Sequence, residues 1–353
     1  MPTLLDVAKR AGVSPMTVSR VVNGFGPVSP ELRARVEQAL AETGYMPNIV
    51  ARNLRTRRTD TIALLMPDMT NPFFTTLAHG VETAAREAGI SLLLANSDER
   101  EDEERRLVPM LLQRQVDGLL IIPAGTAAET VRLCREQGVP LVVVDRRPDT
   151  PGVDVVRADS EGGALELGRL LVGLGHRRVA VLSGPTSVPT AVDRATGFSR
   201  AFVEEAGLSA PLVLHGAFTI DSGHAMTLSA MRHAPRPTAI FAANNFIAIG
   251  VMHGLEELHL RVPDDVAVVG FDDLPRAMVT FPFLTVVAQP AFEMGQRSVA
   301  MLLGHLADPD APARDVVLPT ELVIRRSSGG PVTEPATPRA HRPGEDPVLD
   351  PTM

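Results

Sequence analysis

The 353-residue sequence contains one cysteine (Cys134), no tryptophan, one tyrosine and no long apolar run. A single cysteine excludes an internal disulfide and any metal site built from several thiolates, and Cys134 is expected to be a half-buried helix residue. No apolar run approaches the ~18 residues that a membrane-spanning helix needs. The first residues carry Asp6, Lys9 and Arg10 and form no apolar block of signal-peptide length. These absences predict a cytoplasmic protein.

Sequence signatures of catalysis are also missing. There is no nucleophile elbow, no Walker loop, and no glycine-rich dinucleotide loop after the first expected strand. Histidine and acidic residues do not gather at metal-ligand spacing. We therefore expect no enzyme, no cofactor and no metal, with an acid–base pair of Asp145 and Asp272 as the one catalytic alternative.

The net charge of −8 is unevenly distributed along the chain. Residues 1–58 hold nine basic and four acidic residues, a net charge of +5, whereas the remainder holds 25 basic and 38 acidic residues, a net charge of −13. A basic N-terminal module on an acidic body suggests that one part of the chain meets a polyanion such as DNA. A solvated basic face without a partner is the alternative.

The N-terminal module has the start and stop signals of three short helices. Thr3 and Asp6 suit a capping box, and Gly12 suits the end of that helix. The pairs Ser14-Pro15 and Ser29-Pro30 are helix starts in which a capping side chain precedes a proline, and Gly44 ends the third helix. After Pro47, residues 48–55 form an amphipathic segment too short to be a stable helix by itself.

From residue 61 short apolar runs alternate with amphipathic segments. This alternation predicts strands and helices of parallel sheets covered on both faces, arranged as two similar lobes whose ligands bind beyond the carboxyl ends of the strands. The acidic stretch 98–104 is expected to be a solvated helix start. The expected strands are 61–66, 90–95, 118–122, 141–144, 179–182, 212–214, 238–242 and 266–269; the expected helices are 73–88, 101–115, 127–137, 161–174, 190–206, 222–233 and 246–258.

Several motifs resemble the lac repressor/purine repressor family of bacterial transcription regulators, in that family's order and spacing. They are Leu5–Asn23, Pro47–Leu54, Asn71–Phe74, Val116–Leu119, Arg236–Ala239 and Gly270–Asp273. The resemblance implies an N-terminal all-α helix-turn-helix domain with a hinge helix, followed by a two-lobed α/β body of parallel sheets like the type I periplasmic binding proteins. The expected limits are 1–46 for the helix-turn-helix, 47–58 for the hinge helix and linker, 60–159 plus 290–318 for the first lobe, 160–289 plus 319–326 for the second, and 327–353 for a disordered Pro-rich tail.

The resemblance also assigns DNA-contacting residues. Pro15, Met16 and Arg20 would read bases in the major groove, where arginine can hold a guanine with two hydrogen bonds. Ser14, Thr17 and Asn23 would contact phosphates. In the hinge, Leu54 would insert between base pairs in the minor groove, beside the basic Arg55. The alternatives are a surface charge for Arg20 and a core anchor for Leu54.

The body resembles periplasmic sugar-binding proteins, and its cleft most resembles that of ribose-binding protein. A monosaccharide needs aromatic plates against its ring faces and polar side chains around its hydroxyl rim, and buried polar groups are costly unless such a ligand satisfies them. The resemblance assigns Phe73, Phe74 and Phe218 as plates. It assigns the rim to Asn71, Asp145, Arg146, Arg194, Asn244, Asp272 and Gln289.

The sequence therefore predicts a DNA-binding transcriptional regulator, a repressor, controlled by a ribose-like or other monosaccharide between its lobes. Its expected partners are a near-palindromic operator and a second copy of the chain in a homodimer, with a tetramer as the alternative. A purine or nucleoside effector stays open, although Val188 occupies the place where the purine repressor has a base-contacting arginine. A transport-type sugar-binding protein is the remaining alternative.

Overall fold

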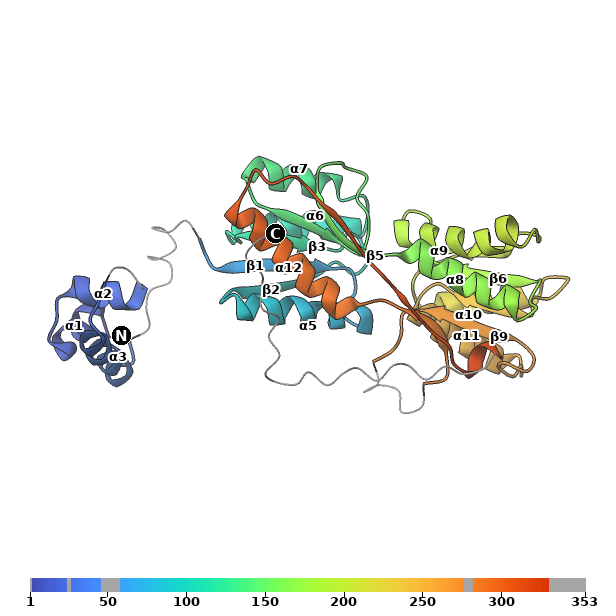
Figure 1. Cartoon of the computed structure of the whole chain (residues 1–353), viewed down its shortest axis with the longest axis horizontal. Helices are drawn as coiled ribbons and strands as arrows, with labels where there is room; N and C mark the ends of the chain where they lie inside the picture. The colour runs from blue at the N-terminus through green and yellow to red at the C-terminus, as the bar shows by residue number, and fades with distance from the viewer. Residues whose placement is uncertain (1, 24–26, 46–57, 276–281, 330–353) are drawn as a thin grey trace, which may run out of the picture.

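The computed structural model describes residues 2–23, 27–45, 58–275 and 282–329 (Figure 1). The expected hinge segment, apart from Arg58, and the expected tail beyond residue 329 lie outside the described residues. None of the described helices has the length and apolar content needed to cross a lipid bilayer.

Three helices form the N-terminal domain: α1 (Leu4–Ala11), α2 (Pro15–Asn23) and α3 (Pro30–Thr43). The predicted caps are confirmed, because Thr3 and Asp6 form a reciprocal capping box and Gly12 ends α1 in the left-handed conformation. Arg35 Nη2 donates to the carbonyl oxygen of Ala11 over 2.6 Å and fixes α3 against the turn that follows α1. The helices enclose one small apolar core.

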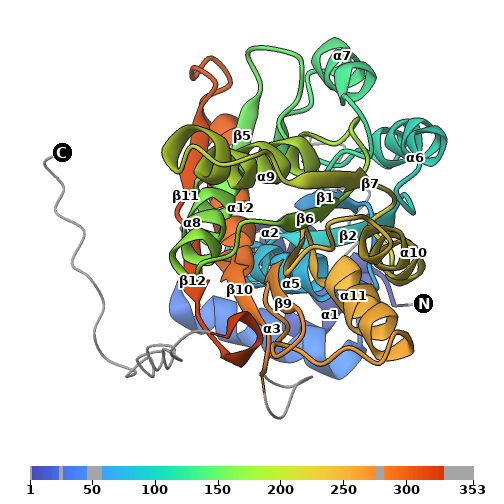
Figure 2. The same ribbon diagram turned by 90° about the vertical axis from the view of Figure 1, so that its right-hand side faces the viewer.

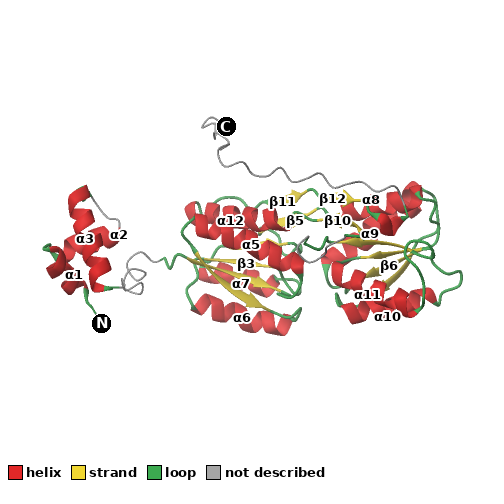
Figure 3. Ribbon diagram, turned by 90° about the horizontal axis from the view of Figure 1, so that it is seen from below, coloured by secondary structure: helices red, strands yellow, loops and turns green. Residues whose placement is uncertain are grey.

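The N-lobe contains a six-stranded sheet of order β11-β5-β4-β3-β1-β2, in which neighbouring strands are all parallel. Helices α5 (Pro72–Glu87) and α12 (Ala291–Ala307) cover one face, and α6 (Glu101–Gln113) and α7 (Ala128–Gln137) cover the other (Figure 3). Its strands are β1 (Thr61–Met66), β2 (Ser91–Asn96), β3 (Gly118–Ile121), β4 (Leu141–Val144), β5 (Asp154–Ala158) and β11 (Asp315–Leu318).

The C-lobe repeats this design with the strand order β12-β10-β9-β8-β6-β7, in which only β12 runs antiparallel to its neighbour. Helices α8 (Ser160–Gly173) and α9 (Pro189–Arg200) cover one face, and α10 (Ile220–Met231) and α11 (Asn245–Glu257) the other (Figure 2). Its strands are β6 (Val179–Ser183), β7 (Leu212–His215), β8 (Ala239–Ala242), β9 (Ala267–Phe271), β10 (Thr285–Ala288) and β12 (Glu321–Val323). The predicted fold class is confirmed.

The chain passes between the lobes after β5, after β10 and between β11 and β12. The expected elements do not include β5, β10, β11, β12 or α12. The four strands are short, and each has at least one partner strand that is distant in sequence. The C-lobe also extends beyond its expected limit at residue 326. Ser327 and Ser328 are buried, and Ser327 Oγ donates to the carbonyl oxygen of Val268 over 2.6 Å.

Two local expectations were wrong. Cys134 is fully buried in the N-lobe core rather than half-buried, and burial raises its pKa to about 12. The acidic stretch is only partly a solvated helix start. Glu101 does pair with Arg105, at 3.8 Å. Glu104, in contrast, is buried, and it accepts from the backbone N–H of Ala124 over 2.7 Å.

Helices α5 and α12 pack closely because each has a glycine that faces the backbone of the other helix. A Cβ at Gly80 would lie 2.1 Å from the carbonyl oxygen of Phe292, so Gly80→Ala must push the helices apart. We expect a loss of about 1–3 kcal/mol in the free energy of unfolding, measured by denaturation followed by calorimetry or dye binding. In the control Gly173→Ala the new Cβ meets open space, so stability should stay within about 1 kcal/mol. Equal effects of the two substitutions would contradict this packing.

Candidate functional site

A cavity lies between the lobes, where the carboxyl ends of the parallel strands of both sheets converge. Nine of the ten predicted ligand residues line it, and the tenth, Gln289, follows β10 and donates to Asp272 Oδ1. Three further residues line the cavity that the sequence did not predict as ligand residues, namely Asp68, Glu99 and Thr190. Asp68 and Glu99 follow β1 and β2, so their position after a strand was the available signal. The predicted residues in the lining are Asn71, Phe73, Phe74, Asp145, Arg146, Arg194, Phe218, Asn244 and Asp272.

Two aspartates occupy equivalent places in the two lobes. Asp145 directly follows β4 and Asp272 directly follows β9, and both have the left-handed backbone conformation, with φ of 67° and 70°. Each backbone N–H donates to the adjacent strand, at 2.8 Å to Val156 and 2.9 Å to Val287. Non-glycine residues held in this strained conformation gather at functional sites.

Two buried arginines accompany these aspartates. Arg146 donates to both carboxylate oxygens of Glu99, at 2.7 and 2.6 Å, and to the carbonyl oxygen of Pro123 at 2.8 Å. Arg194 lies over the ring of Phe271 at 3.9 Å and donates to the carbonyl oxygen of Ala243. Its Nη1 lies 3.6 Å from Asp272 Oδ2. Both guanidinium groups are therefore held in fixed orientations beside the cavity.

Aromatic side chains from both lobes border the same cavity. Phe73 and Phe74 begin α5 and meet edge to face with ring centroids 5.1 Å apart. Phe218 follows β7, and its ring packs over Gly184, where a Cβ would lie 2.2 Å from the ring. The N-lobe and the C-lobe thus each contribute apolar surface to a site whose remaining lining is polar.

Most of the buried side-chain polar atoms that lack a hydrogen-bond partner lie in this cluster. Among the described residues five such atoms occur, and four of them are Asp145 Oδ1, Arg146 Nε, Arg194 Nε and Gln289 Oε1. Buried polar atoms are otherwise almost always paired, and each unpaired atom costs on the order of 1–3 kcal/mol. Two unpaired acceptors and two unpaired donors therefore belong to residues that line the cavity or, for Gln289, bond to its lining.

Burial dominates the electrostatics of the two aspartates. It raises the pKa of Asp145 to about 6, against the opposing effect of Arg194 and Arg146. It also raises the pKa of Asp272, partly offset by Arg194 and by the hydrogen bond from Gln289. The lining as a whole holds four carboxylates, Asp68 and Glu99 included, and two guanidinium groups.

The lobes touch each other directly beside the cavity. Asn71 and Asn245 exchange two side-chain hydrogen bonds, of 3.1 and 2.8 Å, and Arg147 pairs with Asp193 at 2.5 Å. The cavity holds about 20 Å³, little more than the room for one water molecule. A monosaccharide therefore requires the lobes to move apart from this arrangement.

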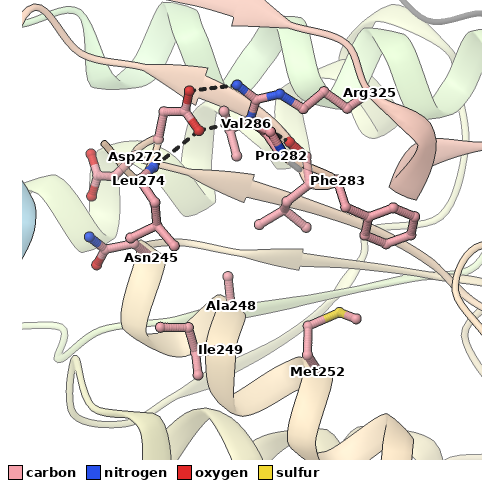
Figure 4. A pocket seen from close by; sticks show the side chains of 12 residues that line it. Asn245, Ala248, Ile249, Met252, Asp272, Leu274, Pro282, Phe283, Val286 and Arg325 are labelled. Carbon is pink, nitrogen blue, oxygen red and sulfur yellow. Dashed lines mark hydrogen bonds and ion pairs between the residues drawn. The ribbon is translucent and has the colours of Figure 1, made fainter. Parts of the chain in front are cut away.

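A second pocket, of about 200 Å³, lies on the C-lobe between α11 and the chain that leads into β10 (Figure 4). Ile249, Met252 and Phe283 give it apolar walls, and Asp272 lines both cavities. Arg325 holds Asp273 with bonds of 2.7 and 2.6 Å at its edge. In the motif Gly270–Asp273, Asp272 thus lines the cleft, whereas Asp273 forms an ion pair with Arg325. An apolar chamber of this kind does not suit a polyol.

The N-terminal domain places the predicted base readers at its surface. Pro15 and Arg20 are exposed on α2, and 66% of the accessible surface of Met16 is exposed. Ser14 and Thr17 bond to each other through their hydroxyls at 2.9 Å. The predicted DNA contacts of these residues stay predictions. The side chain of Asn23, and Leu54 and Arg55 entirely, lie outside the described residues.

Comparisons with known proteins match both parts of the chain. A family model described as bacterial regulatory proteins, lacI family, matches residues 3–48. A model described as periplasmic binding proteins and sugar binding domain of LacI family matches residues 59–326. The ribose operon repressor of Escherichia coli K12 is 35% identical over 331 residues, which cover 93% of this chain and all of that protein.

Two solved structures match as well. One is the lac repressor dimer bound to operator and the anti-inducer ONPF, with a TM-score of 0.83, 30% identity, and coverage of 93% of this chain and 99% of that one. The other is a LacI family transcriptional regulator from Enterococcus faecium with bound ribose. It has a TM-score of 0.68, 30% identity, and coverage of 76% of this chain and 98% of that one.

The raised pKa of Asp145 predicts how stability depends on pH. Above pH 6 the folded protein buries a carboxylate charge that the unfolded chain exposes to water, so the contribution of Asp145 to the stability of the ligand-free protein becomes more favourable as the pH falls from 7.5 to 5. Asp145→Asn removes that charge and should stabilise the ligand-free protein by about 1–3 kcal/mol at pH 7.5. Unfolding measured at both pH values should show this advantage shrinking at pH 5. An equal stability gain of Asp145→Asn at pH 7.5 and pH 5 would contradict the raised pKa of Asp145.

Proposed function

Because the chain belongs to the lacI family of bacterial regulatory proteins, we propose that it is a repressor whose operator binding is controlled by a ribose-like monosaccharide. It acts as a homodimer on a near-palindromic operator, in the cytoplasm. Members of this family are transcription regulators rather than enzymes, so the two strained aspartates serve ligand recognition and not acid–base catalysis. The proposed domain limits are those expected from the sequence, with the C-lobe extended through Ser328.

The single observation that carries the effector proposal is the set of unpaired donors and acceptors between aromatic side chains in the cleft. Sugar hydroxyls both donate and accept, so one polyol can satisfy Asp145 Oδ1 and Gln289 Oε1 as well as the Nε atoms of both arginines. The phenylalanines match the apolar ring faces. A ribose-bound relative with the same fold supports this choice.

The charge of the cleft lining restricts the chemical class of the effector further. Four carboxylates against two guanidinium groups leave the lining net acidic when all are ionised. An effector carrying a phosphate would be repelled, because like charges at close range in a poorly solvated site cost several kcal/mol. The effector is therefore an unphosphorylated sugar, which enters when the contact between Asn71 and Asn245 opens.

DNA recognition is assigned to the exposed face of α2. Arg20 reads a guanine, Pro15 and Met16 contact base edges, and Ser14, Thr17 and Asn23 contact phosphates. Leu54 and Arg55 act in the minor groove. The two lobes can adopt two arrangements relative to each other, and the effector binds one of them more tightly. The ratio of the two effector affinities sets how much effector binding can change operator affinity.

The test combines ligand and operator binding. D-ribose at about a hundred times its Kd should add about 2.7 kcal/mol of stability, which is roughly 5–10 °C in the melting temperature. It should also release an operator selected from random DNA by the wild-type protein. Asp272→Asn should weaken ribose binding by about 10- to 100-fold and keep operator binding. The control Asp221→Asn alters an exposed carboxylate on α10 and should change neither.

D-ribose-5-phosphate and hypoxanthine complete the ligand panel. Neither should shift the melting temperature. A shift with hypoxanthine but with no sugar would overturn the effector assignment and leave the DNA-binding assignment intact. A shift with the phosphate ester equal to that with ribose would contradict the charge argument.

A further inference from the structure

The chain enters the N-lobe through Arg58, Thr59 and Asp60, which follow the segment 47–57. The backbone N–H of Thr59 donates to Asp117 Oδ1 over 2.8 Å. Thr59 Oγ1 lies 2.9 Å from the carbonyl oxygen of Gln115 and 3.1 Å from Asp117 Oδ1. Thr59 is therefore held by both its backbone and its side chain at the amino end of β3.

The neighbouring residues add further attachments. Arg58 Nη2 donates over 2.8 Å to the carbonyl oxygen of Leu306 in the last turn of α12, where a cation suits the free carbonyls. Asp60 turns the chain with a left-handed φ of 48°, and its carbonyl oxygen accepts from Ser91 N over 2.8 Å. The entering segment thus contacts α12, β2 and the start of β3 within three residues.

Asp117 lies in the motif Val116–Leu119, to which the DNA and effector sites give no role. Each of its first three residues has a separate contact. Val116 is buried in the N-lobe core, and the backbone N–H of Asp117 donates to the carbonyl oxygen of Thr61 over 2.7 Å. At Gly118 a Cβ would lie 2.8 Å from Leu302 Cδ2, so the glycine lets α12 lie directly on β3. The motif therefore joins the entering segment to the sheet and to α12.

The elements that meet at this attachment also reach the effector cleft. Strand β1 starts at Thr61, beside Asp117, and ends at Met66, close in sequence to Asp68 of the cleft lining. Helix α12 starts just after Gln289 and ends beside the Arg58 contact. With 17 residues it spans about 25 Å. Both elements run across the N-lobe from the cleft to the point where the chain enters.

We propose that Asp117 is a positioning residue that clamps the linker to the N-lobe, so that movement of this lobe reaches the operator-binding segment. Without the clamp the linker gains conformational freedom, which operator binding must remove again. Movement of the N-lobe would also be transmitted less completely to the DNA-binding domain. The effector-dependent part of this proposal rests on the proposed function, whereas the effect on operator affinity does not.

The charge of Asp117 makes the test specific. A carboxylate does not bind DNA phosphates, so a loss of operator affinity on its removal does not reflect a lost phosphate contact. The slope of log affinity against log salt should therefore stay that of the wild type. Asp117→Ala removes the acceptor of the Thr59 bond. Asp117→Asn retains a side-chain oxygen in the same place and serves as the conservative variant.

We expect Asp117→Ala to weaken binding of the selected operator by about three- to tenfold at constant salt slope. The ratio of operator affinities without and with D-ribose should fall toward one. D-ribose affinity should stay within about twofold of the wild type, because the cleft lies at the other end of the sheet. Asp117→Asn should restore most of the operator affinity. The matched control Asp310→Ala removes an exposed carboxylate close to the end of α12 and should alter none of these values.

Thr59→Val removes the hydroxyl contacts to Gln115 and Asp117 and keeps the backbone bond to Asp117, so it weakens the same attachment. It is a safeguard if Asp117→Ala fails to fold. It should weaken operator binding, and its effect should be less than additive with that of Asp117→Ala. Unchanged operator affinity in folded Asp117→Ala or in Thr59→Val would overturn the clamp. The clamp would also be overturned if Asp117→Asn failed to restore the operator affinity lost in Asp117→Ala and the losses in Asp117→Ala and Thr59→Val were fully additive. If D-ribose affects no variant, the effector assignment fails while the operator affinities still decide the clamp.

Discussion

Four fully buried ionisable side chains, Asp145, Arg146, Arg194 and Asp272, meet between the lobes, and the cost of burying them constrains the rest of the structure. Buried charges are tolerated only when partners and hydrogen bonds replace water. The Nη atoms of Arg146 obtain these from Glu99 and Pro123, whereas Arg146 Nε and Asp145 Oδ1 have no hydrogen-bond partner. The protein itself therefore does not supply hydrogen-bond partners for every buried polar atom of the cluster. A polyol ligand can supply the missing partners.

Parallel sheets explain why one lobe can serve both the cleft and the linker. All carboxyl ends of its strands lie at the cleft, and all amino ends lie at the opposite edge, where Thr59 and Asp117 meet. An antiparallel sheet would mix the two kinds of strand end at each edge. Parallel strands also need covering helices on both faces, and α12 fills that role while its two ends lie near Gln289 and Arg58. The same architecture thus sets the place of the ligand and the place of the linker.

The sequence predicts the site where local signals and position after a strand agree. Asp145 and Asp272 follow strands that apolar runs reveal, and nine of the ten expected residues do line one cavity. Glu99 was missed because it lies in the acidic stretch 98–104, which looks like a solvated helix start, and only tertiary structure brings it to Arg146. Strands β10 and β12 were also not expected from periodicity, because each is only three or four residues long and β12 pairs only with β10. The predicted DNA contacts remain untested, and the expected hinge residues lie outside the described part of the chain.

Transmission between cleft and linker requires that the N-lobe move without deforming. Its close glycine contacts supply this stiffness, because a Cβ at Gly295 would lie 2.2 Å from the carbonyl oxygen of Leu77 on α5. Backbones in such contact cannot slide without losing packing over the whole helix. Movement between two stiff lobes would then have to occur in the three segments that pass between them. On the mechanism proposed above, opening the contact between Asn71 and Asn245 would displace the N-lobe as a rigid body, and the linker would follow it through the attachment at Thr59 and Asp117.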